Sequence, residues 1–90
     1  MVFIISYDLC KPTQRYEELI EAIKHYPRWA CLGGSAYLIE TEQSHVEVRD
    51  NLGHYIDGND KLFVGRVSAP AAWNGMANEV SEWIKNRLNE

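Results

Sequence analysis

Cysteine, proline and long apolar runs are all scarce in this sequence. Its two cysteines, Cys10 and Cys31, allow at most one disulfide, unlike the dense disulfide framework of small secreted domains. The opening apolar run, residues 2–5, is shorter than a signal-peptide core and far below the roughly 20 residues of a membrane span. We therefore expect a cytoplasmic protein with no membrane partner, whose cysteines are reduced and pack as small buried residues.

Basic charge is also limited. Nine Lys and Arg stand against 13 Asp and Glu, a formal charge of −4, which argues against the strongly basic footprint of a dedicated nucleic-acid binder. The acids concentrate in residues 36–60, where Arg49 is the single base. Because residues 1–35 balance the two signs, we expect a polyanion to approach the N-terminal half.

The length of 90 residues gives room for one domain, residues 1–90, with a core small enough to profit from a partner subunit. Strands are predicted from short runs of β-branched and aromatic residues, and the run at 2–7 is apolar on both faces, as in a central strand. The Gly33-Gly34 pair predicts a two-residue hairpin turn. The predicted strands cover residues 2–7, 29–32, 35–41 and 62–67.

Three helices are predicted from apolar residues at helical spacing. The first begins near Thr13, the second at a capping box of Ser44 and Glu47, and the third near Asn78. Their apolar stripes are Tyr16, Leu19, Ile20 and Ile23; Val48, Leu52, Tyr55 and Ile56; and Val80, Trp83, Ile84 and Leu88.

This element order predicts an α+β fold of the ferredoxin-like β-α-β-β-α-β type with an extra C-terminal helix. In this fold both crossover helices lie on one face of the sheet. The first and last strands are apolar on both faces, so the opposite face would then expose a large apolar patch that must be covered; the residues are Val2, Phe3, Ile4, Ile5, Leu62, Phe63 and Val64. Either the C-terminal helix or the sheet of a second subunit can cover it, and we expect a homodimer.

Asp8 is the most informative polar residue. It follows the first strand and shares, by alternation, the uncovered face with Ile4 and Ser6. Two Asp8 carboxylates that meet across a dimer interface would be placed to share Mg²⁺ or Mn²⁺. The alternative is that Asp8 caps backbone amides of the following turn.

Three segments resemble a known family. They are residues 3–9 (Phe-Ile-Ile-Ser-Tyr-Asp-Leu), residues 35–37 (Ser-Ala-Tyr) and residues 60–64 (Asp-Lys-Leu-Phe-Val). Together with the element order, they resemble the CRISPR-associated "Cas-two" superfamily. The chain looks closest to its stand-alone SinR-like branch, whose members share a Tyr-Asp-Leu strand end, a Lys-Pro turn and a Ser-x-aromatic strand.

The resemblance implies a ferredoxin-like homodimer and, in active members, metal-dependent cleavage of phosphodiesters. Asp8 matches the carboxylate that holds Mg or Mn and is the candidate catalytic residue. Tyr7, Ser35 and Tyr37 match supporting positions. Because aromatic residues at strand spacing are also typical of a core, stacking of Tyr7 and Tyr37 on bases remains an alternative.

Basic residues around the first helix, Lys11, Arg15 and Arg28, are candidates for contacts with nucleic-acid phosphates. The arginine-rich start of this helix in many active members is reduced here to Lys11 and Arg15, which predicts weaker, more salt-sensitive binding. The alternative is an ordinary solvated helix face. Near the C-terminus, Trp73 and Trp83 either dock the tail or present a surface to another protein.

Three functions therefore stay open. The first is a dimeric binding module in defence or mobile-element biology that contacts RNA, DNA or a defence-system protein, with at most weak metal-dependent phosphodiesterase activity. The second is an active Mg- or Mn-dependent endoribonuclease or deoxyribonuclease that uses Asp8 from both subunits. The third is a dimer that binds a small ligand, since this fold hosts many functions.

Overall fold

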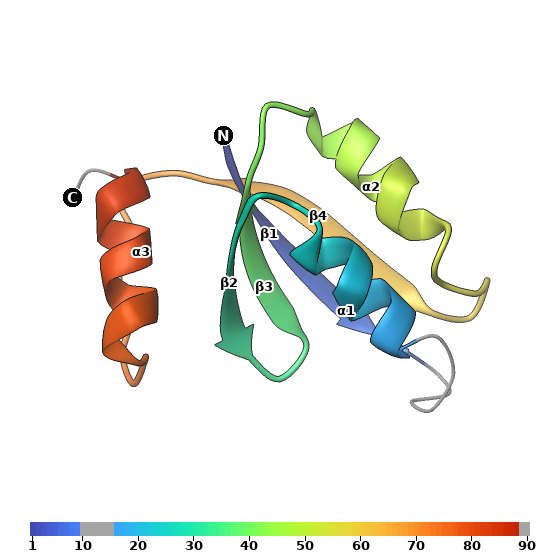
Figure 1. Cartoon of the computed structure of the whole chain (residues 1–90), viewed down its shortest axis with the longest axis horizontal. Helices are drawn as coiled ribbons and strands as arrows, with labels where there is room; N and C mark the ends of the chain where they lie inside the picture. The colour runs from blue at the N-terminus through green and yellow to red at the C-terminus, as the bar shows by residue number, and fades with distance from the viewer. Residues whose placement is uncertain (10–15, 89–90) are drawn as a thin grey trace.

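The structure, a computed structural model, describes residues 1–9 and 16–88 and contains the predicted succession of elements (Figure 1). The strands are β1 Val2–Asp8, β2 Arg28–Gly33, β3 Ala36–Glu40 and β4 Lys61–Val67. The helices are α1 Tyr16–Lys24, α2 His45–Gly53 and α3 Asn78–Leu88. This order confirms the α+β, ferredoxin-like prediction with an additional C-terminal helix.

The four strands form one antiparallel sheet in the order β2-β3-β1-β4. Strand β1 lies between β3 and β4, where Ile5 stands opposite Tyr37 on one side and Val64 on the other. The doubly apolar pattern of residues 2–7 is therefore that of an inner strand, as predicted. Strands β2 and β4 lie at the two ends of this order.

Helices α1 and α2 cover one face of the sheet (Figure 1). Phe3 and Ile5 of β1 point to this side and pack with Ile23 of α1 and with Val48 and Leu52 of α2. All five side chains are almost completely buried. Apolar stripes at helical spacing on both helices thus meet alternate residues of the central strand, which gives the larger of the two cores.

Helix α3 lies on the opposite face (Figure 1). Its Ile84 and Leu88 form a second cluster with Val2 of β1 and Leu38 of β3. Trp73 and Trp83 pack against this cluster. The C-terminal tail therefore docks on the sheet, which was one of the two alternatives for Trp73 and Trp83. Helix α3 covers part of this face.

The glycine pair lies at the predicted hairpin, but its turn is shifted by one residue. Gly33 and Gly34 adopt positive φ angles of 105° and 56°, which favour glycine, yet Gly33 ends β2 and pairs with Ala36, so the two-residue loop is formed by residues 34–35. Ser44 Oγ accepts a hydrogen bond from Glu47 N at 3.1 Å, and Glu47 Oε1 accepts one from Ser44 N at 2.8 Å. This reciprocal pair is the predicted capping box and fixes the start of α2.

Cys31 is a free thiol, as expected, but the prediction that it is buried is wrong, because it is exposed to solvent. Cys31 lies near the end of β2, at one end of the strand order, where the register with β3 shifts between Cys31 and Gly33. Too little of the fold covers this position to bury it. Cys10 falls outside the described residues. In the part of the chain that the structure describes, we find no helix with the length and apolarity needed to cross a membrane.

Candidate functional site

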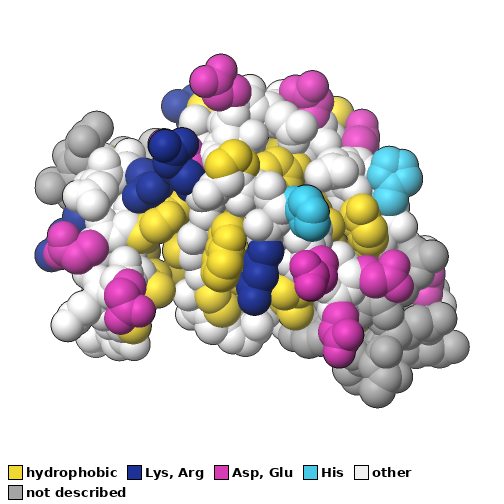
Figure 2. Space-filling model, in the orientation of Figure 1, with side chains coloured by type: hydrophobic (Ala, Val, Ile, Leu, Met, Phe, Trp, Pro, Cys, Tyr) yellow, Lys and Arg dark blue, Asp and Glu magenta, His cyan; other side chains and the backbone are white. Residues whose placement is uncertain are grey.

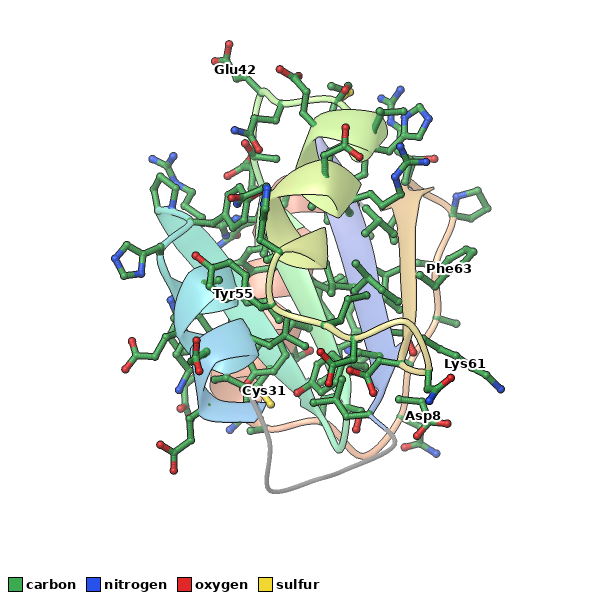
Figure 3. All side chains as sticks on the ribbon, turned by 90° about the vertical axis from the view of Figure 1, so that its right-hand side faces the viewer. Asp8, Cys31, Glu42, Tyr55, Lys61 and Phe63 are labelled. Carbon is green, nitrogen blue, oxygen red and sulfur yellow. The ribbon has the colours of Figure 1, made fainter. Side chains whose placement is uncertain are left out.

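Asp8 is the last residue of β1 and is exposed. It stands opposite Lys61, the first residue of β4, in the antiparallel register. Figure 3 shows both side chains at the same end of the sheet. Alternation along β1 places Asp8 on the face that carries Val2 and Ile4, so the prediction that it shares the face opposite α1 and α2 agrees with the structure.

Phe63 of β4 lies beside this end of β1, opposite Ser6. It is 63% exposed and is the most exposed large apolar side chain in the described part of the chain. A Cβ atom added to Gly65 would lie 2.8 Å from Cε2 of the Phe63 ring. Gly65 thus allows the ring to lie along the strand, which holds an apolar surface in place.

Helix α3 leaves this part of the face uncovered. Val2 and Leu38 are buried beneath α3, whereas Ser6 and Phe63 are exposed on the same face farther along the strands. We call the uncovered part the open sheet surface; it comprises Ser6, Asp8, Lys61 and Phe63. The expected bare face is therefore reduced to one end of the β1–β4 pair.

Among the described residues of one copy, Asp8 belongs to no group of side chains that could hold a metal ion. Over residues 1–9 and 16–88, no group of three or more His, Cys, Asp or Glu side chains is arranged to hold a metal ion. Mg²⁺ favours six oxygen ligands, of which protein carboxylates usually supply one or two. Asp8 would fill such a role together with further ligands, such as water, substrate or another copy.

The structure places the predicted basic contacts away from Asp8 or does not describe them. Lys11 and Arg15 fall outside the described residues. Arg28 begins β2 and is in register with Glu40, which is itself opposite Val2 at the other end of β1. At about 3.3 Å per residue, Arg28 lies about 20 Å along the sheet from Asp8.

The supporting residues have structural positions. Tyr7 and Tyr37 are buried in the α1 and α2 core, so the core interpretation is confirmed and their rings are not exposed for stacking on bases. The main-chain oxygen of Ser35 accepts a hydrogen bond from Tyr7 N at 3.1 Å. These three residues hold the end of β1 that carries Asp8.

A second polar cluster, not predicted from the sequence, joins α3 to the sheet. Arg87 of α3 forms an ion pair with Glu40 of β3, at 3.3 Å between Nε and Oε1, and Arg28 approaches the same oxygen at 3.6 Å. In the sequence Arg87 is recognisable only as a base near the end of a helix. Its pairing with Glu40 joins residues far apart in the chain, for which no local pattern exists.

No family model, no curated protein and no solved structure matches the chain. The resemblance to the "Cas-two" superfamily therefore rests on the three sequence segments and on the element order.

Proposed function

We propose that the chain is a self-associating binding module, in which a second copy packs against the open sheet surface. The observation that carries this proposal is the exposure of Phe63 on a face whose remaining apolar residues are covered by α3. Full burial of a phenylalanine side chain contributes about 1.5–3 kcal/mol, so burial of the 63% of Phe63 that is exposed would stabilise an assembly by about 1–2 kcal/mol. A twofold arrangement would gain this twice.

The charges of the open sheet surface suit contact between identical copies. In a twofold interface the same patch meets itself, so a contact from one residue to another across the interface occurs twice, and a residue near the axis meets its own counterpart. Asp8 and Lys61 carry opposite charges on either side of the β1–β4 pair. Asp8 of one copy can therefore approach Lys61 of the other without like charges in direct opposition.

The "Cas-two" resemblance supplies the biological setting of this proposal. It implies that the dimer contacts RNA, DNA or a protein of a defence system or mobile element. The motifs that support this setting include the Tyr7-Asp8 strand end and the Ser35-Ala36-Tyr37 segment. The negative net charge of −4 favours limited, salt-sensitive contacts with nucleic acid over an extended phosphate-binding surface.

A metal-dependent nuclease is the second candidate, favoured by the place of Asp8 within the same open surface. Association there would bring two Asp8 carboxylates to one interface. Bound Mg²⁺ or Mn²⁺ would supply Lewis-acid chemistry toward a phosphodiester. The part of Asp8 is to contribute carboxylate oxygens from each copy, and one acid per copy predicts slow cleavage.

Sedimentation velocity between about 1 and 100 μM tests self-association. We expect the wild-type chain to dimerise and Phe63→Thr to weaken the dimer about a hundredfold, since two rings are lost per dimer. The matched control is Val46→Thr, which removes an exposed apolar side chain from α2. A wild-type chain that stays monomeric, or equal effects of both substitutions, would contradict the proposal.

Titration with Mn²⁺ separates the two candidates. Saturable binding that is lost in Asp8→Asn but kept in Asp57→Asn, an exposed acid outside the open sheet surface, would favour the nuclease. Metal-dependent cleavage of labelled RNA or DNA should then disappear in the same variant. Dimerisation without saturable Mn²⁺ binding would leave the non-catalytic module as the function.

A further inference from the structure

The end of the sheet opposite Asp8 carries a concentration of arginines. Arg28, Arg66 and Arg87 are three of the seven basic residues in the described part of the chain, and they come from β2, β4 and α3. They line two hollows that share Glu40 and Arg87. Figure 2 shows basic side chains gathered where α3 meets the sheet.

Arg87 is held in a fixed position within this cluster. Its guanidinium lies 4.1 Å from the centroid of the Trp83 ring, and its Nη1 donates to Trp83 O at 3.2 Å. Its Nε lies 3.3 Å from Glu40 Oε1. A guanidinium fixed by three contacts has little conformational freedom left to lose when it binds an anion.

Arg28, the first residue of β2, approaches the same carboxylate oxygen. Its Nε lies 3.6 Å from Glu40 Oε1, while its side chain remains 62% exposed. Arg28 and Glu40 already belong to paired strands, so this contact is not required to attach α3 to the sheet. One carboxylate between two guanidinium groups leaves one positive charge in excess within the cluster.

The space beside this cluster is large enough for a small ligand. Arg28, Glu40 and Arg87 line an open groove of about 730 Å³, together with Asn86, whose amide is a further potential donor. Glu42 also lines the groove, but Figure 3 shows its side chain pointing outward at the end of the molecule opposite Asp8. The acid that faces both arginines is therefore Glu40.

We propose that Arg28 and Arg87 bind the terminal phosphate of a phosphomonoester, with Glu40 holding their side chains until the ligand competes for them. The planar fork of a guanidinium matches the oxygens of a phosphate, and two such groups can share its charge. The inference does not rest on the proposed self-association, because Glu40 at the groove is opposite Val2, about 13 Å along β1 from Ser6, the nearest residue of the open sheet surface.

Isothermal titration with uridine 5′-monophosphate, with uridine as the reference, tests the site. We expect the nucleotide to bind with a Kd of about 1 mM or lower, and uridine to bind at least about tenfold more weakly. Arg28→Ala should weaken nucleotide binding about tenfold. The matched control is Arg49→Ala, because Arg49 is 61% exposed and also forms an ion pair, with Asp50 on α2.

Arg87→Lys tests the second arginine while keeping its charge. We expect a similar tenfold loss, because lysine lacks the planar fork. Circular dichroism would check that α3 remains folded in this variant. Equal nucleotide binding by Arg28→Ala and Arg49→Ala would overturn the proposal, as would no binding to the wild-type chain.

Glu40→Gln separates a ligand site from a purely structural ion pair. If Glu40 competes with phosphate, its neutral replacement should tighten nucleotide binding about tenfold. Unchanged or weaker binding by a folded variant would overturn the proposed competition. A 5′-phosphorylated hexanucleotide that binds more tightly than the mononucleotide would support strand ends as the source of the phosphate, and weaker binding would support free nucleotides.

Discussion

The two faces of the sheet differ in how completely they are closed. The α1 and α2 face contains the largest fully buried side chains of the described chain, among them Phe3, Ile5 and Leu52. The α3 face has a smaller buried cluster around Leu38 and Ile84 and leaves Phe63 exposed. Two helices seal the first face, whereas one helix of 11 residues covers part of the second.

Because of this difference, we expect the face covered by α1 and α2 to contribute mainly to stability and the face partly covered by α3 to contribute to binding. Most of the free energy of folding should come from the closed face, because side chains removed fully from water contribute most. The partly covered face carries the two surfaces proposed to bind, the open sheet surface at one end and the arginine cluster at the other. The following substitutions test this division.

The largest expected difference is between two isoleucines on opposite faces. Ile23 of α1 is 0% exposed, and Ile84 of α3 is 4% exposed beside partly buried neighbours. We expect Ile23→Ala to lower the free energy of unfolding by about 4 kcal/mol and Ile84→Ala by about 2 kcal/mol. Urea denaturation measures both, and equal losses would remove the distinction between the faces.

The capping box of α2, on the closed face, should contribute about 1 kcal/mol to the free energy of unfolding. Ser44→Ala removes the side-chain acceptor of Glu47 N, so one backbone donor at the helix start loses its partner. Urea denaturation should show this loss in the free energy of unfolding. Sedimentation velocity should show no change in the dissociation constant of the dimer. A large change in dimerisation would show that the two faces are coupled.

Tyr26 links α2 to the segment before it on the closed side. Its hydroxyl donates to Gln43 Oε1 at 2.9 Å and accepts from Asn51 Nδ2 at 3.0 Å. We expect Tyr26→Phe to lower the free energy of unfolding by about 0.5–1 kcal/mol at neutral pH. Denaturation of the variant and the wild-type chain in parallel measures this difference.

The same residue gives a pH dependence of known sign. Burial raises the pKa of Tyr26 above its ordinary value of 10.0, while the hydrogen bond from Asn51 lowers it and the charge of Glu47 raises it. The folded state therefore retains the proton longer than the unfolded chain. The protonated hydroxyl of Tyr26 therefore contributes to the free energy of unfolding below about pH 10, and this contribution is lost as the pH rises through the folded pKa. The difference in free energy of unfolding between the wild-type chain and Tyr26→Phe should then shrink above about pH 10. A constant difference would contradict this account.

The smallest expected effect on folding is that of Phe63→Thr. Because most of the ring is exposed in a single copy, the free energy of unfolding at low protein concentration should change by less than about 0.5 kcal/mol. Thermal denaturation of dilute samples measures this. A loss above about 2 kcal/mol would mean that Phe63 belongs to the core of one chain and not to a contact surface.

The fold could be predicted from local sequence signals because they act over a few residues. The glycine pair at the hairpin, the Ser44 and Glu47 capping box and the stripe around Ile23 each specify a local geometry, although the turn itself is shifted by one residue. The apolar stripe of α2 was predicted to continue to Ile56, but the helix ends at Gly53 and Ile56 packs from the following loop. Element type was thus more predictable than element length.

The candidate sites could be predicted only in part. Alternation along β1 was enough to place Asp8 on the face opposite α1 and α2. The stripe of α3 shows that the helix buries one side, but it does not specify which part of the sheet it covers. The exposure of Phe63 and the pairing of Arg87 with Glu40 depend on that placement, so they required the structure.

Isotope-filtered NMR on an equal mixture of labelled and unlabelled chains tests the central claim most directly. If a second copy packs on the open sheet surface, the ring protons of Phe63 will show contacts that cross from one copy to the other, and Phe63→Thr will remove them. A wild-type sample whose diffusion is that of one chain, with no contacts between copies at Phe63, would contradict the account.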